Sequence, residues 1–538
     1  MKRNRKFALI GALAVPVIAG GFVLQTHGAS EGSTLLQQVM TLVGERYVDT
    51  LQVNDVYEKA AQGLVRELND PYSELLTPKD LKQFNSRTNG RYGGLGMLIE
   101  EDPKTHQMSV ATVYPNTPAE GGGVREGDKI VKVGPLSTQG WSISQVSDSL
   151  TGTPGTKVNV TFARPGVASP INSTFTRAEI HIPAVPYTLS LGSKIGYIPL
   201  QQFNENAFEN TEAAVKRFQA AGAKGLIIDL RGDPGGILTE ALNISNLFIP
   251  QGAQIASVKG REGPADVEVA KNAPIAPTIP LVVLVDERTA SASEIVSGAL
   301  QDHDRALVVG QTSFGKGLVQ GIYNLDGGYA LKLTTGKWFT PSGRSIQRPR
   351  KYVNGQFVET PADTNETEAS KKARPMYKSD AGRPVYGGGG IAPDIIVQDD
   401  TLTTQEQAFT KAVAPKSQEF FTALTDYSME LAKTVTPNFT VQPAWVNEFY
   451  NRLQSKGVPV DRKTFDGANR YVTRALDQRV AHFAFGDSTA KRRDLPYDAP
   501  LRKAIDLLDK TGSQRDLFAM AGEPLAAGSR VPAPQKKP

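Results

Sequence analysis

Cysteine is absent from this 538-residue chain, and histidine is nearly so, with five copies. Without cysteine the protein forms no disulfides, has no thiol nucleophile and holds no zinc finger or cysteine-ligated cluster. The histidines are too far apart to form a metal-binding pair such as H-E-x-x-H. Hydrolytic chemistry is therefore expected to come mainly from Ser, Thr, Lys, Asp or Glu, and we expect neither a metal ion nor a cofactor.

Acidic residues are missing from the N-terminal segment, and this explains most of the net charge of +5. Residues 1–29 contain four basic residues, Lys2, Arg3, Arg5 and Lys6, and no Asp or Glu. Subtracting those four charges from +5 leaves about +1 for the remainder of the chain. Since no basic stripe with interleaved aromatics occurs elsewhere, the sequence does not indicate nucleic-acid binding.

The basic residues precede an apolar stretch over residues 7–24, which is typical of a secretion signal or a single N-terminal membrane anchor. Ala29 is a small residue suited to cleavage, whereas His27, two residues before it, fits a cleavage site poorly. The alternative is a buried helix of the folded domain. We expect export to the bacterial cell envelope, in the periplasm or attached to the inner membrane, with cleavage of the leader left open.

The remaining pattern predicts a multidomain protein of mixed α/β class. Residues 30–86 have helical periodicity, residues 87–168 have short alternating strands, and residues 403–515 are again helical. Between them, apolar strands at 225–230, 280–285 and 305–309 alternate with helices, which predicts a layered α/β core. The predicted boundaries are 1–29 leader, 30–86 helical region, 87–168 β-rich domain, 169–400 core, 401–522 helical extension and 523–538 disordered tail.

Two motifs resemble catalytic signatures without their context. Residues 310–317 nearly match a phosphate-binding P-loop, but Gly317 stands where Ser or Thr is needed and no helix is predicted to follow. Residues 488–491 and 510–512 echo the S-x-x-K and K-T-G elements of penicillin-recognising enzymes, yet both lie within one short helical region. We interpret both matches as chance.

Ser291 has a more informative position, because it follows a buried strand and opens a predicted helix. Backbone N–H groups converge at such a helix start and stabilise an anion, including the oxyanion of an acyl-transfer intermediate. The alternative is a purely structural capping box with Glu294, three residues later. Local pattern alone favours the cap, and the two interpretations coexist only if the serine faces a cleft.

A set of motifs in fixed order extends this observation over residues 35–400. The set comprises 70–73 (DPYS), 94–96 (GLG), 229–236 (DLRGDPGG), 291–295 (SASEI), 301–302 (QD), 305–310 (RALVVG), 314–317 (FGKG), Gln320 and 390–394 (GIAPD). Together they resemble the carboxy-terminal processing proteases, also called tail-specific proteases, which are serine peptidases with a PDZ domain. The resemblance implies a protease core at 169–400 with an inserted PDZ domain at 87–168.

The resemblance also assigns roles to individual residues. It implies Ser291 as nucleophile, Lys316 as its general base and Gln320 as the residue that orients the lysine. Gln320 reaches Lys316 only if the segment between them is turned or helical, since four residues of extended strand span about 13 Å. The oxyanion donors would be the backbone N–H groups of Gly236, with Gly235 as the near alternative, and Ala292.

The motif departs from the family at two places. Residues 232–233 are Gly-Asp where two asparagines are usual, which puts the shape of the oxyanion loop in question, and Thr289 stands where Ser is frequent.

The PDZ resemblance implies that Gly94, Leu95, Gly96 and Met97 form a loop whose backbone amides bind the terminal carboxylate of a peptide, which adds a strand to the sheet edge. The alternative is an ordinary glycine-rich turn. We therefore expect protein substrates with free, unstructured, apolar C-terminal tails, and the family pattern admits an activating adaptor and a homo-oligomer. The rival hypothesis is a PDZ adaptor, a pseudoprotease that binds tails without cutting them.

Overall fold

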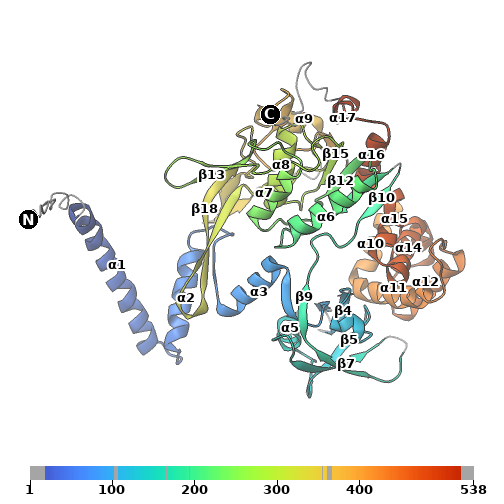
Figure 1. Cartoon of the computed structure of the whole chain (residues 1–538). Helices are drawn as coiled ribbons and strands as arrows, with labels where there is room; N and C mark the ends of the chain where they lie inside the picture. Colours follow the sequence, from blue (N-terminus) through green and yellow to red (C-terminus); the bar gives the residue numbers. More distant parts are fainter. Residues whose placement is uncertain are drawn as a thin grey trace, which may run out of the picture. The chain divides into compact units, whose positions relative to one another are not determined.

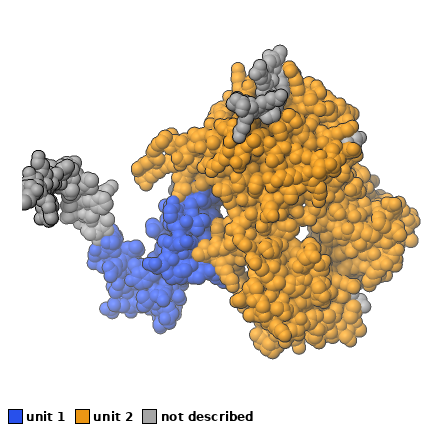
Figure 2. Space-filling model, viewed as in Figure 1, with its two compact units in different colours: residues 1–79, 320–334 blue, residues 80–319, 335–538 orange. Residues whose placement is uncertain are grey.

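The computed structural model describes residues 19–101, 107–164, 167–192, 194–353, 356–359 and 366–522, with backbone alone for 19–31 and 350–359. It divides into two compact units (Figure 2). Unit 1 comprises residues 1–79 and 320–334, and unit 2 comprises residues 80–319 and 335–538. The leader predicted over 1–29 lies mostly outside the described residues, as does the tail predicted over 523–538.

Unit 1 contains two helices, α1 (Ala19–Arg46) and α2 (Val53–Arg66). Strand β1 (Glu74–Leu76) pairs antiparallel with the beginning of β18 (Ala330–Phe339), where Glu74 lies opposite Lys332. The helical periodicity in the N-terminal region is confirmed, and its apolar stripe is exposed: Leu35, Leu36, Val39, Leu42 and Val43. Among the described residues, no helix has both the length and the apolar character needed to cross a membrane.

The PDZ region of unit 2 is an antiparallel sheet with two short helices. Its strands, in sheet order, are β3 (Met97–Glu101), β4 (Met108–Val113), β5 (Lys129–Val133), β7 (Lys157–Ala163) and β8 (Ile171–Thr176), with β6 (Leu136–Ser137) beside β5. The helices are α4 (Pro118–Gly121) and α5 (Ile143–Leu150). Alternate strand residues fill the core, among them Met108, Ile130 and Phe162, which are fully buried. Strands β2 (Arg91–Gly94) and β9 (Ala178–His181) pair as the chain enters and leaves this region, and α3 (Pro78–Asn89) precedes it.

The α/β core is built on a six-stranded sheet. The strand order is β10 (Leu189–Leu191), β11 (Ile195–Pro199), β12 (Gly225–Asp229), β15 (Leu281–Val285), β16 (Leu307–Gly310) and β23 (Ile395–Ile396). All neighbours from β11 to β23 are parallel, and β10 is antiparallel. Every residue of β12 and β15 is buried, which confirms the prediction from their continuous apolar runs.

Helices cover both faces of this sheet (Figure 1). Helices α6 (Ala207–Ala220), α7 (Leu238–Asn246) and α8 (Ala292–Asp302) pack against one set of strand residues, including Ile228 and Val283. Helices α16 (Ala499–Asp509) and α17 (Gln514–Met520) pack against the alternate set, including Ile227 and Val282. The segment predicted as one helical extension, 401–522, thus has two packing partners, and its last two helices form the third layer of the core.

The other helices of that segment have a core of their own. They are α10 (Thr404–Val413), α11 (Ser417–Ala432), α12 (Pro443–Ser455), α13 (Arg462–Gly467), α14 (Asn469–Phe485) and α15 (Asp487–Asp494), with 3-10 helices at Ala414–Lys416 and Leu495–Tyr497. Phe409, Phe420 and Phe465 meet there edge to face and are almost fully buried. We call this cluster, residues 404–494, the helical region. The predicted fold class, mixed α/β with an inserted β-rich domain and C-terminal helices, is confirmed.

Smaller elements complete the chain: β13 (Gln254–Gly260), β14 (Asp266–Val269), β17 (Leu318–Asn324), β19 (Arg350–Val353), β20 (Gln356–Glu359), α9 (Glu368–Lys372), β21 (Met376–Lys378), β22 (Pro384–Tyr386) and a 3-10 helix at Asp326–Gly328. Because the strand β17, and not a helix, follows Gly317, the P-loop interpretation fails in the structure as it did in the sequence.

Candidate active site

Ser291 occupies a strained turn between β15 and α8. Its φ of +56° lies in the left-handed region, which non-glycine residues enter rarely and usually at functional positions. The eleven residues of α8 that follow are all buried, whereas Ser291 itself is only half-buried. The fold therefore places this serine at the accessible end of an otherwise buried helix.

Glu294 connects the serine to the loop that carries Lys316. Its carboxylate is fully buried and accepts hydrogen bonds from four donors. Oε2 accepts the backbone N–H of Ser291 at 2.8 Å and that of Lys316 at 2.9 Å, and Oε1 accepts the N–H of Gly315 at 2.7 Å and Ser313 Oγ at 2.5 Å. Burial raises the pKa of Glu294, and these hydrogen bonds oppose the rise.

The Ser-x-x-Glu pattern forms the capping box that the sequence predicts at the start of α8. The same Glu294 carboxylate also holds the loop that carries Lys316. The structure therefore brings the backbones of Ser291 and Lys316 to one oxygen atom. The sequence pattern identified the contact of Glu294 with Ser291 and missed its contacts with residues 313–316.

The loop that carries Lys316 is fixed on its other side by β18. The indole N–H of buried Trp338 donates to the Lys316 carbonyl at 2.9 Å, and the Gly317 N–H donates to Gln347 Oε1 at 2.9 Å. Gly315 has a φ of +90°, and a Cβ there would lie 3.0 Å from the Gly390 nitrogen. A side chain at that position would therefore strain the loop that carries Lys316.

The loop of residues 231–236 lies directly against the serine. A Cβ on Gly235 would lie 2.7 Å from the Ala292 nitrogen and 2.9 Å from Ser291 Cβ, so only glycine allows this approach. The Gly235 N–H is already used, since it donates to Asp233 Oδ1 at 2.8 Å. Among the described residues, the N–H groups of Gly236 and Ala292 donate no hydrogen bond.

A buried ion cluster holds Arg231, the first residue of the same loop. Arg231 donates to Asp229 and, through two nitrogens at 2.8 Å each, to Asp498 at the start of α16. Lys491 adds a third contact to Asp498, at 2.6 Å. No sequence pattern indicates this cluster, because Arg231 and Asp498 are 267 residues apart. It also explains Lys491 as a structural residue rather than part of an S-x-x-K motif.

Gln320 lies on the extended strand β17, and its amide donates to Thr334 Oγ1 on β18 at 3.3 Å. Both residues belong to unit 1, whereas Lys316 belongs to unit 2. The role of Gln320 in orienting the lysine stays a prediction.

The predicted carboxylate loop of the PDZ region connects β2 and β3. Gly96 has a φ of +84°, and a Cβ there would lie 2.3 Å from Thr117 Cβ. Leu95 is buried, and its carbonyl accepts the Ala119 N–H at 2.8 Å. Burial raises the pKa of Tyr92 to about 12, against the effect of the Gly96 and Met97 N–H groups that face its hydroxyl.

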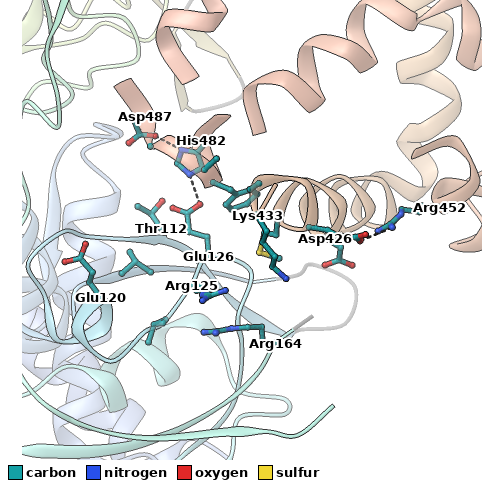
Figure 3. Close-up of a pocket in the computed structure, with 18 residues that line it drawn as sticks. Thr112, Glu120, Arg125, Glu126, Arg164, Asp426, Lys433, Arg452, His482 and Asp487 are labelled. Atoms are coloured by element: carbon teal, nitrogen blue, oxygen red, sulfur yellow. Dashed lines mark hydrogen bonds and ion pairs between the residues drawn. The ribbon is translucent and has the colours of Figure 1, made fainter. Parts of the chain in front are cut away.

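A concavity lies between the PDZ region and the helical region (Figure 3). It has a volume of about 1000 Å³, and its lining mixes both signs of charge. His482 on α14 contacts Glu126 on one side and Asp487 on the other, at 2.6 and 2.8 Å. Neither Ser291 nor Lys316 lines it, so it is separate from the serine site.

Comparison with known proteins identifies two domain families in the chain. Residues 194–356 match Peptidase family S41, and residues 109–164 match the PDZ domain family. The chain is 32% identical over 373 residues to a carboxyl-terminal-processing protease of Synechocystis sp., covering 64% of this chain and 86% of that protein. The chain belongs to the carboxy-terminal processing proteases.

Two further proteases of the family are also similar to this chain. A carboxy-terminal-processing protease of Bartonella bacilliformis is 37% identical over 57% of this chain and 70% of its own length. Carboxy-terminal processing protease CtpA of Bacillus subtilis is 32% identical over 65% of this chain and 76% of its own length. The protein is therefore a serine-type peptidase with bacterial relatives, and the resemblance carried by the ordered motifs is confirmed.

Proposed function

We propose that this protease binds the free C-terminal tail of a protein on its PDZ domain and cleaves the chain with Ser291 as nucleophile and Lys316 as general base. The observation that carries the proposal is the shared acceptor Glu294 Oε2, which takes the backbone N–H groups of both residues. A serine hydroxyl is a weak nucleophile without an adjacent base. In a chain with no cysteine, we assign the Lys316 amine as that base.

The chemical steps follow from this placement. The Lys316 amine takes the proton of Ser291 Oγ while Oγ bonds to the scissile carbonyl carbon. The carbonyl oxygen becomes an oxyanion and accepts hydrogen bonds from the Gly236 and Ala292 N–H groups. The lysine ammonium then gives its proton to the leaving amine as the oxyanion collapses and the C–N bond breaks. Water attacks the acyl carbon and gives its proton to the same lysine, the bond from Ser291 Oγ to the acyl carbon breaks, and the lysine returns the proton to Oγ. Gln320 is assigned to orient the lysine.

Substrate capture is assigned to the PDZ loop of Gly94, Leu95, Gly96 and Met97. The adjacent strand β3 lies at the edge of its sheet, with β4 on its other side. An extended peptide that pairs with β3 places its carboxylate at the loop amides, and alternate side chains meet the PDZ surface. A tail that is free at its C-terminus supplies the carboxylate, an unstructured tail can extend along β3, and apolar side chains can pack on the PDZ surface.

We further propose export to the cell envelope, supported by the basic and apolar leader in residues 1–29. Attachment to the inner membrane, activation by an adaptor and self-association belong to this proposal, and the exposed apolar stripe of α1 is a surface that such an association would cover. Fractionation of cells and N-terminal sequencing of the mature chain test the export.

The cleavage proposal is tested with a purified substrate protein that ends in an apolar tail. We expect Ser291→Ala and Lys316→Ala to lower the cleavage rate by at least about 10³-fold, as loss of a nucleophile or base does in serine proteases. Lys337→Ala, an exposed lysine on β18, is the matched control and keeps full activity. The same substrate with an amidated C-terminus should bind the PDZ domain poorly and be cleaved more slowly.

Wild-type rates in either dyad variant would refute the dyad. A tail that binds to the wild-type protein but is never cut would instead support the rival hypothesis of a PDZ adaptor.

A further inference from the structure

Asp233 is a buried acid at the centre of the oxyanion loop, at one of the two positions where the family usually has asparagine. Its side chain is 0% exposed, and Oδ1 accepts the Gly235 N–H at 2.8 Å. Its backbone carbonyl accepts the Ala290 N–H at 3.0 Å and Ser293 Oγ at 3.2 Å. One residue therefore fixes both the glycine turn and the turn that precedes the nucleophile.

The second carboxyl oxygen has no such partner. Oδ2 is buried and makes no hydrogen bond to any residue that the structure describes. A carboxylate in this position would hold a negative charge out of water with one oxygen unsolvated, which is far more costly than burying a neutral acid. Burial accordingly raises the pKa of Asp233 well above its usual range, and the hydrogen bond from the Gly235 N–H offsets only part of that rise.

The charged groups on the elements packed against Asp233 bind partners other than Asp233. Asp286 accepts the Gly232 N–H and pairs with Arg288, and Arg231 is held by Asp229 and Asp498. Glu294 on α8 binds its four donors, and Glu205, beyond Phe203, pairs with Arg91. In the described part of the chain no Lys, Arg or His forms an ion pair with Asp233, so no cation favours its ionised form.

We propose that Asp233 is a positioning residue that works as a neutral carboxylic acid in place of the asparagine, and that its ionisation at alkaline pH disables the oxyanion site. The inference rests on the proposed function, in which Gly236 and Ala292 supply the oxyanion donors. In the neutral form Oδ1 occupies the Gly235 N–H and leaves the Gly236 N–H for the substrate. In the ionised form a negative charge lies in the same loop as the oxyanion and opposes its formation.

The test compares kcat/KM for the apolar-tailed substrate between pH 5 and pH 10 in the wild type and in Asp233→Asn. The amide of asparagine keeps the acceptor for the Gly235 N–H and cannot ionise. We expect activities within about threefold at neutral pH and a ratio of variant to wild type that rises up to tenfold per pH unit above the ionisation of Asp233. The ratio removes every other titration, including those of Lys316 and His482, because both proteins share them.

Two further variants make the result specific. Asp233→Ala removes the acceptor and should lose activity at every pH, by about 10²-fold, comparable to the loss of one oxyanion donor. Asp128→Asn, a buried aspartate of the PDZ core that pairs with Arg164, is the matched control and should leave the pH profile unchanged. The infrared band of a protonated carboxyl should also weaken in Asp233→Asn.

Two results would overturn the inference. The first is a pair of superimposable pH profiles for the wild type and Asp233→Asn, and the second is a folded but inactive Asp233→Asn at neutral pH. If the wild type itself cleaves no faster than Ser291→Ala, the proposed function fails and not this inference alone.

Discussion

Two of the polar contacts that join the C-terminal helices to the rest of unit 2 differ in burial and charge. At the core, Asp498 meets Arg231 through two hydrogen bonds and Lys491 through a third, and only 5% of the Asp498 side chain is exposed. At the PDZ region, His482 meets Glu126 and Asp487, and 52% of the Asp487 side chain is exposed. We refer to them as the core contact and the PDZ contact.

The two contacts respond to pH in opposite directions. Burial raises the pKa of Asp498, but its hydrogen bonds and charge interactions with Arg231 and Lys491 are together stronger and hold the pKa well below its usual range. Hydrogen bonds to Asp487 and Glu126 raise the pKa of His482 to about 9. A depressed acid stabilises the fold above its unfolded pKa of about 3.9, whereas a raised histidine does so below about 6.5 and loses its contribution as pH rises towards 9.

The difference has a functional consequence within the proposed mechanism. Between about pH 5 and pH 9 the core contact is constant, so the oxyanion loop keeps its support from α16. Over the upper part of that range the PDZ contact weakens, since neutral His482 no longer pairs with Glu126 and Asp487. The catalytic site is thus held firmly, while the attachment of the substrate-binding domain is adjustable.

The largest expected effect comes from removing the core contact. Asp498→Ala leaves Arg231 buried with Asp229 as its remaining acid and also removes the hydrogen bond to the Leu501 N–H that begins α16. Breaking a buried ion pair by deleting one partner costs about 3–5 kcal/mol. We expect a loss of that size in the free energy of unfolding, measured in urea at pH 7, together with a marked loss of cleavage.

The control is Asp506→Ala on the same helix, where the partner is the exposed Lys510. Its cost should stay below about 1 kcal/mol, as for surface ion pairs. Equal costs for the two substitutions would show that burial does not distinguish the core contact.

A moderate effect is expected at the PDZ contact. His482→Gln removes the charge and should lower the free energy of unfolding at pH 6 by on the order of 1–2 kcal/mol, less than the pKa alone implies because Asp487 is half exposed. The difference from the wild type should shrink as pH rises towards 9, where about half of wild-type His482 is neutral. Thermal unfolding at pH 6, 7.5 and 9 measures this trend.

His181→Gln on the exposed part of β9 controls for loss of an imidazole and should leave stability unchanged at every pH. A His482→Gln penalty that stays constant with pH would contradict the assignment of a charged histidine.

The contrast also shows which parts of the fold could be predicted from the sequence. The apolar runs at 225–230, 280–285 and 305–309 predicted the buried strands, because a strand covered on both faces must be apolar throughout. Helical periodicity likewise predicted the helices of residues 403–515, where Leu501 and Leu508 lie, yet a stripe of apolar residues shows which face is covered and not what covers it. That these residues pack on the core sheet therefore emerged only from the structure.

In the candidate site too, some residues could be predicted from the sequence, whereas other contacts are visible only in the structure. Local patterns placed Ser291 and Glu294 at a helix start, and the ordered motifs brought Lys316 into the hypothesis. Glu294 contacts residues 313–316, and Asp498 contacts Arg231, across sequence separations of 19 to 267 residues. Motif spacing does not predict contacts between residues so far apart in the sequence. Asp233 was visible as a departure from the family motif, but its neutral state follows only from its burial and its unpartnered oxygen.

The smallest expected effect concerns the third member of the core contact. Lys491→Gln removes one charge beside Asp498 but leaves both hydrogen bonds from Arg231, so the loss at pH 7 should be about 0.5–1.5 kcal/mol. Without Lys491 the pKa of Asp498 should rise towards its ordinary value. Asp498 is then protonated at a higher pH, so acid unfolding should begin at a higher pH than in the wild type. Urea unfolding at pH 3, 5 and 7 measures both changes. If the free energy of unfolding falls between pH 5 and pH 3 by the same amount in the variant and the wild type, Arg231 alone determines the charge state of Asp498.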